Sequence, residues 1–471
     1  MVQFNSKIDI RLERRGDFIV EKFEKDFRCS INSVFPEWNE SKATYRYLEN
    51  EKIDEKFLNS RLESKCQNLV AGKRVIVIGD TCEFNIDNHK KRLKDTKGLG
   101  MVGRNNKVGF FLQGLLVLER SSKFRLGWGG CQLFNRPMDN KAHTRDNSSL
   151  PIEEKESYKW VGPSIKCRDE VTNLSKHMLF IADREADLYE ALDRIPNENT
   201  DVLIRVWHRN RWVSTADNQQ HKVKHVLNRA KVKCCVTVKI NGECKKRKKR
   251  EAKCKIKYTE VELPLPRKKK VKKNHTSKIK MTLIQIKEVN QSVPKGEKAI
   301  EWNLWTSEKI ENNDQAIELI ECYKSRWHIE EAYRLLKKKG FNFEGTELET
   351  GKGIRKLLFL AMEASVKVMQ LKAARDGKSE IEITKVFTEP EINVLHSLNE
   401  EYQGNTEKQS NPHPKESLGW ASWIIARIGG WKGFASQRPP GTITYKRGLD
   451  KFENMMLGIR IMNKSRDVYK R

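Results

Sequence analysis

The sequence has no apolar run long enough for a membrane helix. No stretch of its 471 residues approaches the roughly 18 apolar residues that such a helix needs. The segment Met1–Arg15 mixes acids and bases instead of forming the apolar core of a signal peptide. Hydrophobic residues make up 37% of the chain and charged residues 33%. This balance predicts a polar, cytoplasmic protein without a membrane partner.

Paired cysteines and internal repeats are also missing. The ten cysteines include no C-x-x-C pair. The one crowded group has no histidine nearby at zinc-finger spacing; it comprises Cys234, Cys235, Cys244 and Cys254. We therefore expect ordinary reduced thiols, and neither a disulfide framework nor a zinc site.

Acidic residues are too few to balance the basic ones. The chain has 92 Lys and Arg against 63 Asp and Glu, a formal charge of +29. Residues 241–280 alone carry 17 basic and 4 acidic residues, including the tracts KKRKKR (245–250) and RKKKVKK (267–273). A polyanion is the expected partner. The tracts fit DNA-contacting hairpin tips better than a nuclear-localisation signal, the alternative for KKRKKR.

The periodicity of the chain predicts three regions. Residues 1–70 carry charge at helical spacing and predict a small basic helical domain. Apolar bursts such as RVIVI (74–78) and MLFIA (178–182) predict the buried strands of an α/β domain over 71–375. Within it, alternation at about 206–306 predicts an inserted antiparallel sheet with a lysine-rich solvated face. Residues 376–471 predict a helical C-terminal domain.

Two of the predicted strands end in an acid. Asp80 follows RVIVIG, and Asp183 follows HMLFIA and begins the charged run DREAD (183–187). The carboxyl ends of buried strands deliver side chains to a crevice. An Asp after a strand is also a common turn or cap residue, so the pair is more informative than either acid alone.

A third group of polar side chains occurs in the helix predicted from Asp314 to Gly340. At about 100° per residue, its members fall within roughly 60° of arc on one face; they are Tyr323, Arg326, Glu330 and Lys337. A solvated, salt-bridged face explains such a stripe equally simply. If it instead faces a cleft, Glu330 joins Asp80 and Asp183 as a third carboxylate. Three converging carboxylates can hold two divalent ions for phosphoryl transfer, and Mg²⁺ accepts so sparse a set.

These motifs resemble those of bacterial cut-and-paste insertion-sequence transposases of the DDE class. The spacing Tyr323-x2-Arg326-x3-Glu330-x6-Lys337 is similar to their Y-R-E-K signature, DREAD to their second catalytic block and Asp80-Thr81 to their first. The likeness extends to YRYLEN near 45, TSE at 306–308 and WA-x3-IAR-x-GG at 420–430. The two basic tracts are more basic than the family pattern.

The resemblance implies an α/β fold: a ribonuclease-H-like mixed-sheet core with an inserted antiparallel β subdomain, flanked by helical domains. It implies that Asp80, Asp183 and Glu330 are catalytic ligands of Mg²⁺, with Mn²⁺ as a substitute. Tyr323, Arg326 and Lys337 would then contact DNA. Arg205 would contact a phosphate and Trp302 would stack on a base, although a core tryptophan is an equal alternative.

The implied activity is nicking at the terminal inverted repeats, hairpin formation, hairpin opening and joining of the 3′-OH to target DNA. The implied partners are double-stranded DNA and a second copy of the chain in a paired-end complex, within the bacterial nucleoid. The N-terminal domain would grip the end, and C-terminal helices would form the dimer. The alternatives are a metal-dependent nuclease or resolvase that cuts without joining, and a catalytically silent DNA-binding regulator.

Overall fold

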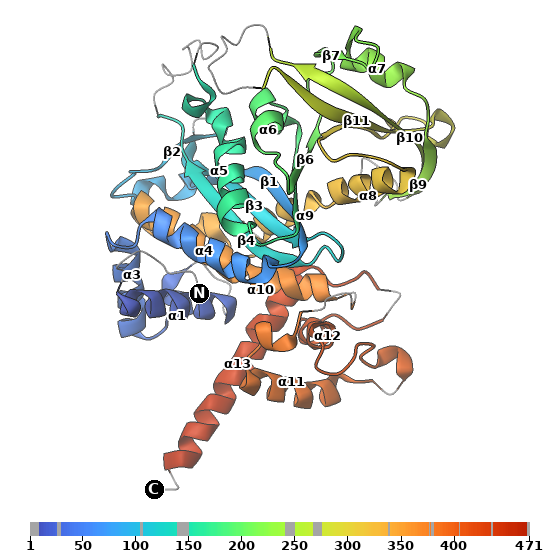
Figure 1. The fold of residues 1–471 in the computed structure, drawn as a ribbon. Helices are drawn as coiled ribbons and strands as arrows, with labels where there is room; N and C mark the ends of the chain where they lie inside the picture. Colours follow the sequence, from blue (N-terminus) through green and yellow to red (C-terminus); the bar gives the residue numbers. More distant parts are fainter. Residues whose placement is uncertain are drawn as a thin grey trace. The chain divides into compact units, whose positions relative to one another are not determined.

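The computed structural model describes residues 9–25, 30–103, 107–138, 150–240, 250–266, 276–337, 340–375, 377, 381–404, 406–434 and 437–468. The chain forms two compact units (Figure 1). Unit 1 comprises Met1–Leu69, Thr81–Ala142 and His328–Arg471, and unit 2 comprises Val70–Asp80 and His143–Trp327. Strand β1 (Arg74–Asn85) runs from unit 2 into unit 1. Both units mix helices with sheet, so the protein is of the mixed α/β class.

Unit 2 contains a mixed sheet. Its strands follow the order β1-β5-β6-β12-β11-β10-β7-β8, and β9 pairs with β10. They are β5 (His177–Ala182), β6 (Thr200–Arg205), β7 (Trp212–Ser214), β8 (Gln220–Lys222), β9 (Cys234–Ile240), β10 (Arg250–Pro264), β11 (Lys278–Glu288) and β12 (Glu301–Thr306). The helices are α5 (Gly162–Lys166), α6 (Tyr189–Arg194), α7 (Val223–Arg229) and α8 (Asn313–Lys324). Strands β1, β5 and β6 are parallel, whereas the remaining pairs are antiparallel.

Burial follows these two kinds of strand. Val75–Ile78 of β1 and Met178–Ala182 of β5 are buried without interruption, as expected for parallel strands covered on both faces. In β9 and the first half of β10, exposed residues alternate with more buried ones, and Lys239, Lys253 and Lys255 are exposed. The predicted lysine-rich solvated face is confirmed there. Strand β11 departs from the alternation because Met281–Ile286 are all buried in its centre, between β10 and β12.

Unit 1 packs helices around a smaller group of strands. Strands β2 (Gly100–Val102), β3 (Lys107–Glu119) and β4 (Arg125–Phe134) are antiparallel neighbours, and the end of β1 lies beside β3. The helices are α1 (Ile10–Lys25), α2 (Ile31–Val34), α3 (Trp38–Glu49), α4 (Glu55–Val70), α9 (Trp327–Leu336), α10 (Gly351–Ala374), α11 (Glu389–Tyr402), α12 (Leu418–Ile428) and α13 (Thr442–Val468). Helix α10 contacts β4, α1, α3, α12 and α13 (Figure 1).

Close backbone packing ties α9 to β3 inside unit 1. The N–H of Gly114 donates to the Tyr333 hydroxyl at 3.1 Å, and a Cβ atom at Gly114 would lie 2.8 Å from that oxygen. Tyr333 also stacks on the fully buried Trp128. The glycine inside strand β3 therefore has a packing reason.

The predicted helix from Asp314 to Gly340 is wrong, because the chain forms two helices, α8 and α9. The N–H groups of Ser325 and Arg326 donate to carbonyls three residues back, at 3.0 and 3.1 Å. This tightens the last turn of α8 to the 3₁₀ type before α9 starts. Neither glycine nor proline marks the break. Burial accounts for the break between α8 and α9, because the side chain of Tyr323 is buried in unit 2 and that of Ile329 is buried in unit 1.

Candidate functional site

Asp80 and Asp183 lie in matching register on neighbouring parallel strands of unit 2. Asp183 follows the end of β5, whereas Asp80 lies inside β1, which continues to Asn85, so the prediction that Asp80 ends its strand is wrong. The register of β1 and β5 pairs Ile78 with Ile181, and each acid follows two residues later. Adjacent strands lie about 4.8 Å apart, so both acids are delivered to the same edge of the sheet. Asp80 is 19% exposed, which leaves its carboxylate accessible at that edge.

Asp183 also caps the 3₁₀ turn that follows it. Its Oδ1 accepts the N–H of Glu185 at 2.8 Å, at the start of the turn Arg184–Ala186. The cap role that an aspartate after a strand commonly plays is therefore present. A carboxylate carries two acceptor oxygens, so capping by Oδ1 is compatible with a further role for Oδ2.

Four of the predicted DNA-contacting residues gather near these acids in unit 2. Arg326 Nη1 lies 3.5 Å from Asp80 Oδ2. The rings of Trp302 and Tyr323 meet edge-on with centroids 5.4 Å apart. Burial raises the pKa of the Tyr323 phenol, while the charges of Arg326 and Arg205 oppose that rise. Strand β12 supplies Trp302, the end of β6 supplies Arg205, and the end of α8 supplies Tyr323.

Glu330 and Lys337 belong to unit 1. Glu330 lies in the first turn of α9 and is half-buried. Lys337 follows that helix, with its Nζ 3.8 Å from Glu344 Oε1 and 5.5 Å from the centroid of the Phe84 ring. The break between α8 and α9 overturns the argument that one straight helix face carries Tyr323, Arg326, Glu330 and Lys337. A shared role of these residues with Asp80 and Asp183 therefore remains a prediction.

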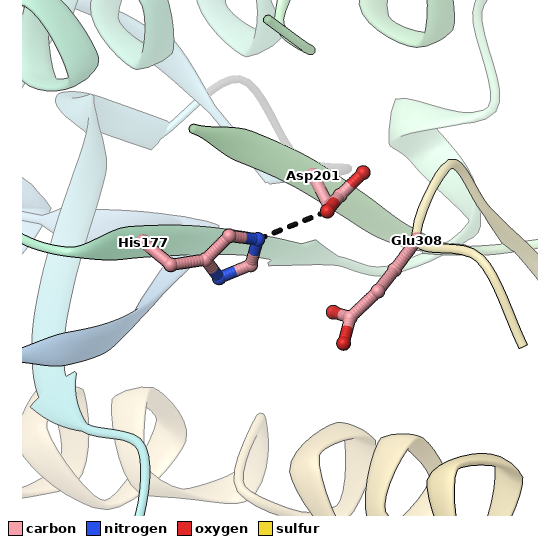
Figure 2. Close-up of side chains that lie close together, drawn as sticks. All are labelled: His177, Asp201 and Glu308. Carbon is pink, nitrogen blue, oxygen red and sulfur yellow. Dashed lines mark hydrogen bonds and ion pairs between the residues drawn. The ribbon is translucent and has the colours of Figure 1, made fainter. Parts of the chain in front are cut away.

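A different set of potential metal ligands lies at the opposite end of β5 (Figure 2). Among the described residues, His177, Asp201 and Glu308 bring one ligand atom each within 4.8 Å of the others. His177 Nε2 is hydrogen-bonded to Asp201 Oδ2 at 2.9 Å, and Asp201 Oδ1 accepts the hydroxyl of Ser307 at 2.6 Å. Arg74 Nη2 approaches Glu308 at 3.8 Å. These bonds tie the start of β5 to β6 and to the TSE motif after β12.

Asp187, the last residue of the DREAD run, is a buried structural acid. Its Oδ2 accepts the N–H groups of Trp207 and His208 at 2.8 and 2.9 Å. Its Oδ1 accepts Arg211 Nη1 at 2.7 Å, and the Asp187 side chain is only 1% exposed. Sequence reasoning missed this role. The one available signal was the dense charge of DREAD directly after the apolar strand β5.

The structure tests the sequence prediction for the cysteines but not the one for the basic tracts. Residues 245–249 and 267–273 lie outside the described residues, so the hairpin-tip prediction for KKRKKR and RKKKVKK stays a prediction. Cysteines in the described ranges are free thiols, and five of them are buried; these are Cys66, Cys82, Cys167, Cys254 and Cys322. Within the same ranges, no helix is both long and apolar enough to cross a membrane.

Two family models match the sequence. The model described as Transposase DNA-binding matches residues 8–53, which include α1 to α3. The model described as Transposase DDE domain matches residues 166–366, which include Asp183 and Glu330, whereas Asp80 precedes the match. The second match implies a metal-dependent DNA-cleaving enzyme, and both imply DNA as a partner. The chain therefore carries a match to a transposase DNA-binding domain and a match to a transposase DDE domain, and together they support a DDE-type transposase.

Proposed function

We propose that this chain is a bacterial cut-and-paste transposase that nicks terminal inverted repeats, forms and reopens a hairpin, and joins the 3′-OH to target DNA. The observation that carries the proposal is the matched placement of Asp80 and Asp183 beyond paired positions of two parallel strands. Structural capping explains one such acid but gives no reason for two at one sheet edge. The ribonuclease-H-like description of this sheet and the domain limits 1–70, 71–375 and 376–471 belong to the same proposal.

The donor set fits Mg²⁺, with Mn²⁺ as a substitute. Asp80, Asp183 and Glu330 would hold the metal through carboxylate oxygens, the donors that Mg²⁺ prefers. All three side chains are partly exposed, so phosphate and water can complete the coordination. When bound, Mg²⁺ supplies activation of the attacking oxygen and stabilisation of the leaving oxygen.

The neighbouring residues of unit 2 would hold and orient the DNA strand. Arg326 offsets the charge of Asp80 and would attract a phosphate to the same edge. The Trp302–Tyr323 pair offers an aromatic edge beside Arg205 for a base and its phosphate. We assign to Lys337 a clamp on the phosphate backbone from unit 1.

DNA-end binding and pairing complete the proposal. The Transposase DNA-binding match at 8–53 supports gripping of the terminal repeat by the N-terminal helices. The exposed lysines of β9 and β10 supply a further positively charged surface for the backbone. Two DNA ends must be held together for joining, so we propose a homodimer formed through C-terminal helices.

The test replaces each ligand separately in the full-length protein. Asp80→Asn, Asp183→Asn and Glu330→Gln should abolish Mg²⁺-dependent nicking of a terminal-repeat duplex while end binding in a gel-shift assay stays within about twofold. The matched control is His177→Gln, which alters the other cluster of potential ligands (Figure 2). It should retain cleavage and its dependence on Mg²⁺. Full activity of Asp183→Asn, or loss of metal dependence in His177→Gln, would contradict the ligand assignment.

Product analysis separates the alternatives. A transposase yields a nick, then a hairpin, then joined target DNA. A nuclease or resolvase yields a product series that stops at cleavage, and a silent regulator binds ends without cutting them. Sedimentation of the protein with two labelled ends tests the dimer, because a paired-end complex contains both labels.

A further inference from the structure

The loop after β6 carries an exposed tryptophan. Trp207 has 54% of its surface accessible, whereas Trp128, Trp160 and Trp305 are buried. The guanidinium carbon of Arg184 lies 4.9 Å from the centroid of the Trp207 ring. Arg184 directly follows Asp183 in the chain. The cation that pairs with the Trp207 ring is therefore the chain neighbour of Asp183, a proposed metal ligand.

The structure fixes this loop in place. Asp187 accepts the backbone N–H groups of Trp207 and His208, and it is itself held by Arg211 through both its side chain and its carbonyl oxygen. The Asp187 side chain is 1% exposed. A buried charge carries a large desolvation cost unless it is paired. The hydrogen bonds that pair the Asp187 carboxylate also fix the backbone at Trp207, whose ring is exposed.

Trp207 and Arg184 line a cavity of about 570 Å³, within the usual size range of ligand sites. The remaining walls include Lys159, Trp160 and His208. Lys159 lies 3.4 Å from Glu156 and 3.8 Å from Glu185, so its charge is shared with carboxylates. The cavity thus combines an aromatic face, a guanidinium and a partly balanced charge, which suits a flat polar heterocycle better than an apolar ligand.

We propose that Trp207 and Arg184 form a stacking platform for one unpaired DNA base beside Asp183. The ring and the guanidinium are the two kinds of surface on which bases stack in single strands. This platform is distinct from Trp302, whose ring already meets Tyr323. The inference rests on the proposed function, because the base belongs to the strand being cut. Asp187 acts as a positioning residue for the platform.

The experiment is a double-mutant cycle between protein and DNA. Full-length wild type and Trp207→Ala are compared on terminal-repeat duplexes that carry a single abasic nucleotide, moved one position at a time around the cleavage site. On intact DNA, Trp207→Ala should slow single-turnover cleavage by about 5- to 150-fold, the range that truncation of a base-stacking aromatic gives. At one position, the abasic nucleotide should slow wild type equally and leave Trp207→Ala with no further loss.

Two further variants guard against a folding artefact. Trp207→Phe keeps an aromatic face and should retain most of the rate, whereas Trp207→Leu keeps bulk without it and should behave as Trp207→Ala. The matched control is Trp212→Ala, because Trp212 is 52% exposed and has Lys222 over its ring but does not line the cavity. It should cleave at the wild-type rate.

The outcomes separate this inference from the function on which it rests. An unchanged rate in Trp207→Ala, or additive losses at every abasic position, overturns the platform even when Asp183→Asn is inactive. Cleavage by Asp183→Asn overturns the proposed function instead. A coupled loss at a single position, with Asp183→Asn inactive and Trp212→Ala normal, supports both.

Discussion

Replacing Asp187 by alanine should loosen the loop 206–211 and destabilise unit 2. The substitution removes three hydrogen bonds at once, which the N–H groups of Trp207 and His208 and the Arg211 guanidinium donate to the two carboxylate oxygens. Breaking a buried charged pair costs about 3–5 kcal/mol. Arg211 is 19% exposed and water can partly replace its partner, so we expect a loss of about 3 kcal/mol, near the lower end of that range.

Hydrogen exchange measures this effect where it arises. In Asp187→Ala, the amides of Trp207 and His208 should exchange about two orders of magnitude faster, the rate equivalent of about 3 kcal/mol. The urea midpoint of unit 2 should fall. Asp187→Asn, which keeps an acceptor for the backbone but loses the charge, should fall between alanine and wild type.

Asp217→Ala is the matched control, because Asp217 holds a turn of the same unit from an exposed position. It should leave exchange at 207 and 208 unchanged. The reasoning is refuted if Asp187→Ala exchanges at the wild-type rate at these two amides, since their protection would then come from elsewhere in the loop.

Two predictions concern stability within unit 1. Burial by itself raises the pKa of Glu331, but the hydrogen bond from His328 and the charge of Lys372 outweigh it and lower that pKa to about 2. The folded-state pKa is depressed, so Glu331 stabilises the fold above its ordinary pKa near 4.5, and the contribution of up to about 3 kcal/mol is lost as pH falls toward 2. Glu331→Gln should therefore flatten the acid limb of a pH titration of the urea midpoint, and an unchanged limb would disprove the linkage. Separately, Arg61→Met should lower the stability by about 2 kcal/mol, because Glu363, 5% exposed and 3.0 Å from Arg61, loses its buried partner and retains the exposed Lys65 at 2.5 Å. Calorimetry should show much of that loss recovered in Arg61→Met/Glu363→Leu, and a double variant no better than the single one would contradict the pairing.

Local sequence pattern was sufficient to predict the strands whose burial follows a regular pattern along the chain. The unbroken apolar runs before Asp80 and Asp183 predicted buried strands, and both runs are buried in β1 and β5. The lysine alternation of β9 and β10 predicted a sheet with one solvated face. These predictions succeeded because each depends on neighbours two or four residues away, and such spacing is visible in the chain itself.

Tertiary packing decided what local pattern could not. The helix predicted through Ser325 breaks there, although no glycine or proline marks the place, because Tyr323 and Ile329 are buried in different units. The buried role of Asp187 depends on a loop twenty residues further along the chain. By itself, the sequence determined that an acid closely follows each of two apolar strand segments in a basic chain. Only the fold decided that those strands are parallel neighbours in register, because strand pairing is a contact between segments about a hundred residues apart.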